Sequence, residues 1–103
     1  MGTGNPYLMH GNTFEWDDDK AAENLNAHRV SFEEATLAVD DPFGIESPDT
    51  REAYGEERFV LVGMSQGQLL AVVYTEREDR IRIISARKAT KREQDDYYRQ
   101  NAS

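Results

Sequence analysis

Residues 58–86 read Arg-Phe-Val-Leu-Val-Gly-Met-Ser, Gln-Gly-Gln, Leu-Leu-Ala-Val-Val-Tyr-Thr, Glu-Arg-Glu-Asp and Arg-Ile-Arg-Ile-Ile-Ser-Ala, and this stretch decides the fold. Segments 58–65, 69–75 and 80–86 are rich in apolar and β-branched residues, which predicts three strands. Gln66-Gly67 and the polar residues 76–79 are turn signals between them. Because connections this short join antiparallel neighbours, the second half of the chain is predicted to form an antiparallel meander.

Two helices are predicted ahead of the meander. Asp17 has the N-cap position of a helix that runs to about Ala27, and its inward face would carry Ala21, Leu25 and His28. Residues 30–34 start a second helix, which should end before the proline of Asp-Asp-Pro at 40–42.

The remaining segments complete an α+β layout. Ser31 and Glu34 fit a capping box at the start of the second helix. Residues 14–16 are compatible with a short strand, and residues 43–56 with an edge strand followed by a loop. A polar C-terminal helix follows Thr90, with a tyrosine at position 97 as its anchor. The chain is therefore predicted to be an α+β domain with two helices, an antiparallel sheet and a last helix.

Composition narrows the class of protein. The chain has 103 residues, enough for one domain with a modest core, and it contains no cysteine. Disulfides, thiolate metal sites and a cysteine nucleophile are therefore excluded. No apolar run approaches the roughly 18 residues that span a bilayer, and the N-terminus does not resemble a signal peptide. We expect a cytoplasmic protein, with residues 1–12 as a flexible extension and residues 13–103 as a single domain.

Charge is distributed unevenly along the chain. The net charge is −8, and residues 1–56 hold three Lys or Arg against thirteen Asp or Glu. Residues 80–92 nevertheless contain six cations and no acid. An acidic protein with one cationic strip is suited to bind an anion such as phosphate locally, rather than to coat nucleic acid without selectivity.

Several segments taken together resemble the BrnT family, the toxin halves of bacterial type II toxin–antitoxin pairs. The resemblance covers about residues 13–99. It rests on Phe-Glu-Trp-Asp at 14–17, Asn24-Leu25, His28, Val-Ser-Phe-Glu-Glu-Ala at 30–35, Asp41-Pro42, Gly-Glu-Glu-Arg at 55–58, and residues 80–90. Its most specific element is Arg-Ile-Ile-Ser-Ala-Arg-Lys-Ala-Thr at 82–90, followed by Glu93.

Membership would imply a RelE-like ribonuclease fold, in which two N-terminal helices pack on an antiparallel sheet that is followed by a C-terminal helix. It would also imply RNA cleavage and neutralisation by a BrnA-type ribbon-helix-helix antitoxin in a hetero-oligomer. The toxin would then contact DNA only through the antitoxin, and no membrane partner is implied.

Metal-independent RNA cleavage requires a base, an acid and cations that stabilise charge on the phosphate. Arginine suits the last role because its planar fork grips phosphate oxygens. Arg82 and Arg87 are the predicted catalytic cations. Strict strand alternation places Arg80 and Arg82 on one face and Ser85 on the other. From periodicity alone, Arg80 and Arg82 could equally be the solvent face of an amphipathic strand.

The remaining candidates are less specific. His28 is the best-placed titrating group, although a histidine that ends an apolar helix face is commonly structural. Glu57 and Arg58 supply an alternative acid or base and a further cation. Ser85, Arg80 and Lys88 are predicted to bind substrate, and Ser85 could instead satisfy a backbone group.

No metal or other cofactor is predicted. The five aspartates at 17–19 and 40–41 lie at a helix start and a helix end, which explains them without an ion. Two functions remain open. One is a ribonuclease toxin, and the other is a catalytically weak partner that binds the antitoxin and assists in repressing their operon.

Overall fold

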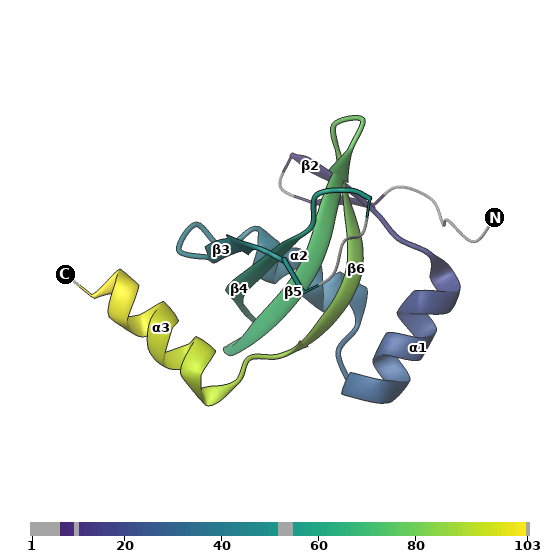
Figure 1. The fold of residues 1–103 in the computed structure, drawn as a ribbon. Coiled ribbons are helices and arrows are strands. Elements are labelled where there is room, and N and C mark those ends of the chain that lie inside the picture. The colour runs from purple at the N-terminus through teal and green to yellow at the C-terminus, as the bar shows by residue number, and fades with distance from the viewer. Residues whose placement is uncertain (1–6, 10, 52–54, 103) are drawn as a thin grey trace.

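The computed structural model describes residues 7–9, 11–51 and 55–102 of the chain. The elements in these ranges are β1 (Tyr7–Met9), β2 (Asn12–Glu15), α1 (Asp18–His28), α2 (Phe32–Val39), β3 (Ile45–Pro48), β4 (Phe59–Ser65), β5 (Gln68–Arg77), β6 (Arg80–Lys88) and α3 (Lys91–Asn101) (Figure 1). The predicted α+β layout and the meander are confirmed. None of the described helices is long and apolar enough to cross a membrane.

The strands form one sheet in the order β1-β2-β6-β5-β4-β3. Four neighbouring pairs are antiparallel, but β2 runs parallel to β6, with Phe14 opposite Ile81 and Glu15 opposite Arg82. The expectation of a purely antiparallel sheet was therefore wrong. Parallel strands need a long connection, and here most of the chain lies between the two partners.

The N-terminal residues contribute a strand that the sequence did not predict. Residues 7–9 pair with residues 12–14 of β2 in a tight hairpin, in which Gly11 has a φ of 84°. Residues 1–6 and 10 lie outside the described part of the chain. The expected flexible extension thus includes β1, whose pairing covers the outer edge of β2.

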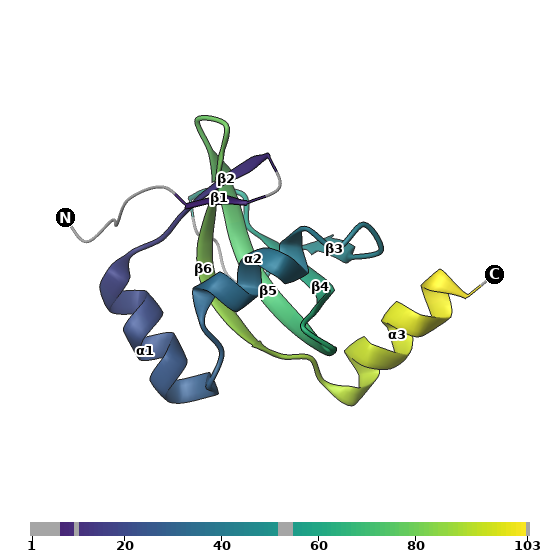
Figure 2. The same cartoon turned by 180° about the vertical axis from the view of Figure 1, so that it is seen from behind.

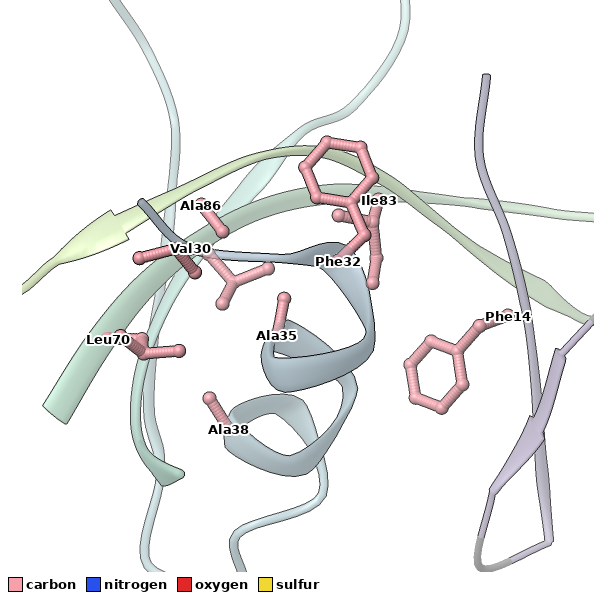
Figure 3. Packing of buried hydrophobic residues seen from close by; sticks show 9 residues of the cluster. Phe14, Val30, Phe32, Ala35, Ala38, Leu70, Ile83 and Ala86 are labelled. Carbon is pink, nitrogen blue, oxygen red and sulfur yellow. The ribbon is translucent and has the colours of Figure 1, made fainter. Parts of the chain in front are cut away.

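Helix α2 packs against one face of the sheet and builds the main core (Figure 3). Buried apolar side chains from both layers meet there, namely Phe14, Val30, Phe32, Ala35, Ala38, Leu70, Val72, Ile83 and Ala86. Gly63 on β4 lets the helix approach closely, because a Cβ at this position would lie 2.1 Å from the carbonyl oxygen of Ala38. The Ser31–Glu34 capping box predicted for α2 is present.

Helix α1 lies beside the edge of β6, and one buried side chain joins them. Asn24 Nδ2 donates to the carbonyl oxygens of Ala86 (2.8 Å) and Val30 (3.0 Å), and its Oδ1 accepts from the Ala86 amide (3.1 Å). The predicted inward face is confirmed only at Ala21, which packs against the core, and was wrong for Leu25 and His28, which are exposed. The unpaired backbone of β6 determines which side of α1 faces inward, because buried N–H and C=O groups must be satisfied.

Helix α3 is attached to the opposite face of the sheet through Tyr97, the predicted anchor. The Tyr97 side chain packs beside Val62 and Ala71, and its hydroxyl donates to Asp41 Oδ2 at 2.6 Å. The same carboxylate accepts the amide of Met64 at 2.8 Å and that of Phe43 at 2.9 Å. Asp41 therefore links the end of α2, strand β4 and α3.

These contacts shift two pKa values. Burial alone would raise the pKa of Asp41, but the hydrogen bonds from Tyr97, Met64 and Phe43 outweigh it and lower that pKa below its ordinary 3.8. Burial, together with the hydrogen bond to Asp41, raises the pKa of Tyr97 to about 12.

Replacing Asn24 tests the link between α1 and β6. Asn24→Ala should lower the free energy of unfolding by about 3 kcal/mol, because three buried backbone groups lose their partner. Asn26→Ala is the matched control, since Asn26 is exposed on the same helix, and it should change stability by less than about 0.5 kcal/mol. Urea unfolding at neutral pH measures both. Equal midpoints for the two variants would contradict the structural role of Asn24.

Replacing Tyr97 tests how α3 is held. Tyr97→Phe should cost about 2 kcal/mol near neutral pH, because a hydrogen bond to a charged acceptor is lost. Tyr98→Phe is the control, since Tyr98 is exposed, and it should leave the stability unchanged.

The same variant should flatten the pH dependence of stability at both ends. Below about pH 3.8, unfolded Asp41 takes up a proton before folded Asp41 does, so wild-type stability falls as the pH decreases. Between about pH 10 and 12, unfolded Tyr97 loses its proton first, so stability falls as the pH rises. Urea titrations across pH measure both slopes, and identical slopes in Tyr97→Phe and wild type would refute the coupling.

Candidate functional site

A β-bulge in β6 places Arg82, Ser85 and Arg87 on one side of the sheet. Pairing with β5 places Arg82 opposite Thr75, Ser85 opposite Val73 and Arg87 opposite Ala71, and the register shifts between Val73 and Tyr74. The bulge leaves Ile84 without a partner on β5, so Ser85 turns to the side of the arginines. The placement of Ser85 on the opposite face by strict alternation was therefore wrong.

We call this surface the arginine face, formed by Arg58, Arg80, Arg82, Ser85 and Arg87. It is the side of the sheet that faces away from α2. Helix α2 lies behind the sheet in Figure 1 and in front of it in Figure 2. Arg58 directly precedes β4, and two-residue alternation puts it on the same side as Val60. Its Nε donates to Glu56 at 3.0 Å.

A buried carboxylate holds the two arginines at one end of this face. Glu15 accepts from Arg80 Nη1 at 3.3 Å and from Arg82 Nε at 3.1 Å. The contact follows from the parallel pairing of β2 with β6, which puts Glu15 directly beside Arg82. A buried carboxylate such as that of Glu15 requires charged partners of this kind to offset its desolvation.

Arg87 is held at the other end by the N-terminus of α3. Its two terminal nitrogens donate to the two carboxylate oxygens of Glu93 at 2.8 and 3.0 Å. Glu93 also accepts the amide of Thr90 as part of a capping box. The hydrogen bonds with Glu93 raise the pKa of Arg87, and those from Arg87 lower the pKa of Glu93. The guanidinium is thus oriented and permanently charged.

A hollow of about 300 Å³ opens beside Arg87. It lies between the end of β3, the sheet and α3, and is lined by Ser47, Pro48, Asp49, Thr50, Arg51, Val60, Val73, Ser85, Arg87 and Glu93. Arg51 forms a fork to the buried Asp49, with both nitrogen–oxygen distances at 2.8 Å. Arg51 is close enough to Arg87 for their repulsion to offset a small part of the rise in the pKa of Arg87 that Glu93 causes.

Arg51, Asp49 and Glu93 were not among the predicted site residues. Arg51 and Asp49 belong to the segment predicted as edge strand and loop, and an Asp-x-Arg sequence is too common to signal a site. The Thr-x-x-Glu pattern at 90–93 is a local signal that could have identified Glu93 as a capping residue. That pattern gives no indication of its second contact, which depends on how α3 meets β6.

His28 approaches Ser85 from the other side. It is exposed at the end of α1 and lines a second hollow with Lys20, Glu23, Asn24, Ala27, Ile84 and Ser85. Ser85 therefore lines both hollows, with His28 on one side and Arg87 on the other.

Two predicted residues are not on the arginine face. Lys88 pairs with Leu70, whose side chain belongs to the core under α2, so Lys88 points away from Arg87. Glu57 lines a separate hollow with Glu56 and Glu76 at the far ends of β4 and β5. Neither is placed to contact a ligand bound next to Ser85.

The arrangement is suited to hold an oxyanion. The oriented guanidiniums of Arg51 and Arg87 supply fixed positive charge, and Ser85 supplies a hydroxyl to the same hollow. Among the described residues, no group of three or more His, Cys, Asp or Glu side chains could hold a metal ion.

Comparison with known proteins provides the family. Residues 16–93 match the family of the ribonuclease toxin BrnT of type II toxin–antitoxin systems. The matched region runs from Trp16, through α1, α2 and the meander, to Glu93 in α3. A search of curated proteins finds no match. Most of the chain, including Arg51, Ser85 and Arg87, thus lies within the match, and the protein belongs to the BrnT family of ribonuclease toxins.

Proposed function

We propose that the chain cleaves RNA over the hollow between Arg51 and Arg87, without a metal ion. The observation that carries the proposal is that two carboxylate-held arginines, Arg51 and Arg87, line one hollow together with Ser85. In RNA cleavage, negative charge grows on the phosphate oxygens in the transition state. Arginines that are oriented beforehand stabilise this charge without further reorganisation.

The reaction balances as an internal transfer of the phosphate ester. The ribose 2′-OH gives its proton to a base, and its oxygen attacks the neighbouring phosphorus. The bond to the 5′-oxygen breaks, and that oxygen takes a proton from an acid. The products are a 2′,3′-cyclic phosphate and a free 5′-OH. His28 is the proposed base, because it shares a hollow with Ser85 and a neutral imidazole nitrogen can accept a proton.

The fold and partners are part of the same proposal. The α2 layer and the meander support a RelE-like domain over residues 13–103, to which β1 adds an edge strand. A BrnA-type ribbon-helix-helix antitoxin is the proposed partner, since type II systems pair a toxin with a protein antitoxin. The cytoplasm, where both RNA and antitoxin are made, is the proposed location.

One observation favours the second function, a catalytically weak partner of the antitoxin. The four arginines Arg51, Arg80, Arg82 and Arg87 share three carboxylates, from Asp49, Glu15 and Glu93. Such pairing reduces the positive field that reaches an RNA strand. We favour the ribonuclease, because the same pairing orients the guanidiniums, and orientation matters more than net charge for stabilising a transition state.

Replacing Arg87 distinguishes the two functions. Arg87→Ala should reduce the rate of RNA cleavage by about 100-fold or more, the scale for loss of one oriented donor. Arg87→Lys should restore only part of the rate, because lysine lacks the planar fork. Purified proteins and a labelled RNA without added metal provide the measurement, together with growth of bacteria expressing each variant.

Arg99→Ala is the control, since it removes one charge from an exposed pair with Asp96 on α3. It should cleave RNA and arrest growth like the wild type. If Arg87→Ala folds, binds the antitoxin and retains full activity, the hollow is not the catalytic site. If the wild type itself cleaves no RNA, the second function is preferred.

A further inference from the structure

The arginine face and the hollow beside it contain two arginine centres rather than one. The first consists of Arg87 and Arg51 at the hollow, and the second of Arg80 and Arg82 around Glu15. Along β5, the partners of Arg82 and Arg87 are Thr75 and Ala71. These partners are four positions apart, which corresponds to about 13 Å along the strand.

The guanidiniums of Arg82 and Arg87 are also turned in opposite directions. Arg82 is bonded to Glu15 on β2, at one side of β6. Arg87 lines the hollow with Val60 and Val73, which belong to β4 and β5 on the other side. Both orientations are held by carboxylates, so the two centres cannot converge on one phosphate group.

We propose that Arg82 and Arg80 form a second phosphate subsite, which binds a phosphate of the same RNA strand at a distance from the cleaved bond. This inference rests on the proposed function and deepens it. In this ion-paired cluster two guanidiniums share the single carboxylate of Glu15, so a phosphate can bind beside it without displacing that carboxylate. At its Arg80 end the cluster borders a hollow that Glu76, Arg77, Glu78 and Asp79 also line.

The burial of Glu15 supports a built site. Its side chain is 9% exposed, whereas those of Arg80 and Arg82 are 45% and 24% exposed. The carboxylate thus lies beneath the guanidiniums, which remain accessible from the solvent. Glu15 is a positioning residue in this arrangement, and it lies one residue before the region that matches the family.

The subsite predicts a preference for length in the substrate. An RNA with a single phosphate reaches only the hollow, whereas a longer single strand reaches both centres. We expect affinity to increase by about tenfold, in one step, at the length where the strand first contacts the second centre. The salt dependence of binding should steepen by about 0.7 in log–log slope at that length.

The test uses 2′-deoxy oligonucleotides that carry one to four phosphates, which bind but cannot be cleaved for lack of the 2′-OH. Fluorescence anisotropy at several salt concentrations measures affinity for the wild type and for Arg82→Gln, which keeps most of the aliphatic stem. Arg80→Ala is a second variant in case Arg82→Gln is unstable, and Arg99→Ala is the charge control. The affinity step and the steeper slope should disappear in Arg82→Gln and persist in Arg99→Ala.

Two outcomes would overturn the inference. One is a smooth rise of affinity with length that is the same in wild type and Arg82→Gln. The other is an equal loss at every length in Arg82→Gln, which would put Arg82 and Arg87 on the same phosphate. Cleavage of the matching ribose oligonucleotides separately tests the proposed function. Strands that bind with a step but are not cleaved would retain the subsite and refute the ribonuclease.

Discussion

The outer edge of β6 is satisfied by two unlike groups, and the rest of the structure depends on this. Near its start, β6 is paired with the backbone of β2, and at Ala86 it is bonded by the side-chain amide of Asn24. The β-bulge at Ile84 lies between these two regions. The outer edge of β6 thereby positions β2 and α1. The bulge between these contacts turns the side chain of Ser85 to the side of the arginines.

The same edge arrangement explains how an acidic chain presents arginines in an oriented form. The parallel register puts Glu15 beside Arg82, and the helix that follows β6 brings Glu93 to Arg87. Each carboxylate decreases the local positive charge and at the same time fixes the direction of a guanidinium. The carboxylates thus orient the guanidiniums but weaken the positive field around them. Such a site is suited to selective contact with particular phosphates more than to general attraction of nucleic acid.

Much of the fold was predictable because it depends on local patterns. Alternating apolar runs predicted β4, β5 and β6, and Ser31 with Glu34 predicted the start of α2. The contacts of the site were predictable only in part. Arg82 and Arg87 stood out as cations in a strand, but their carboxylate partners come from β2 and α3. Arg51 was missed, because no local pattern indicates that its loop lines the same hollow as Ser85.

The sequence by itself determined the classes and order of most elements, the anchor at Tyr97 and the arginines of the last strand, since short-range periodicity and capping control these. The tertiary structure alone decided the parallel pair, the face of Ser85, the inward side of α1 and the separation of two arginine centres. These features depend on satisfying buried backbone groups and charges between segments far apart in the chain. Such long-range pairings have no signature in any local window of residues.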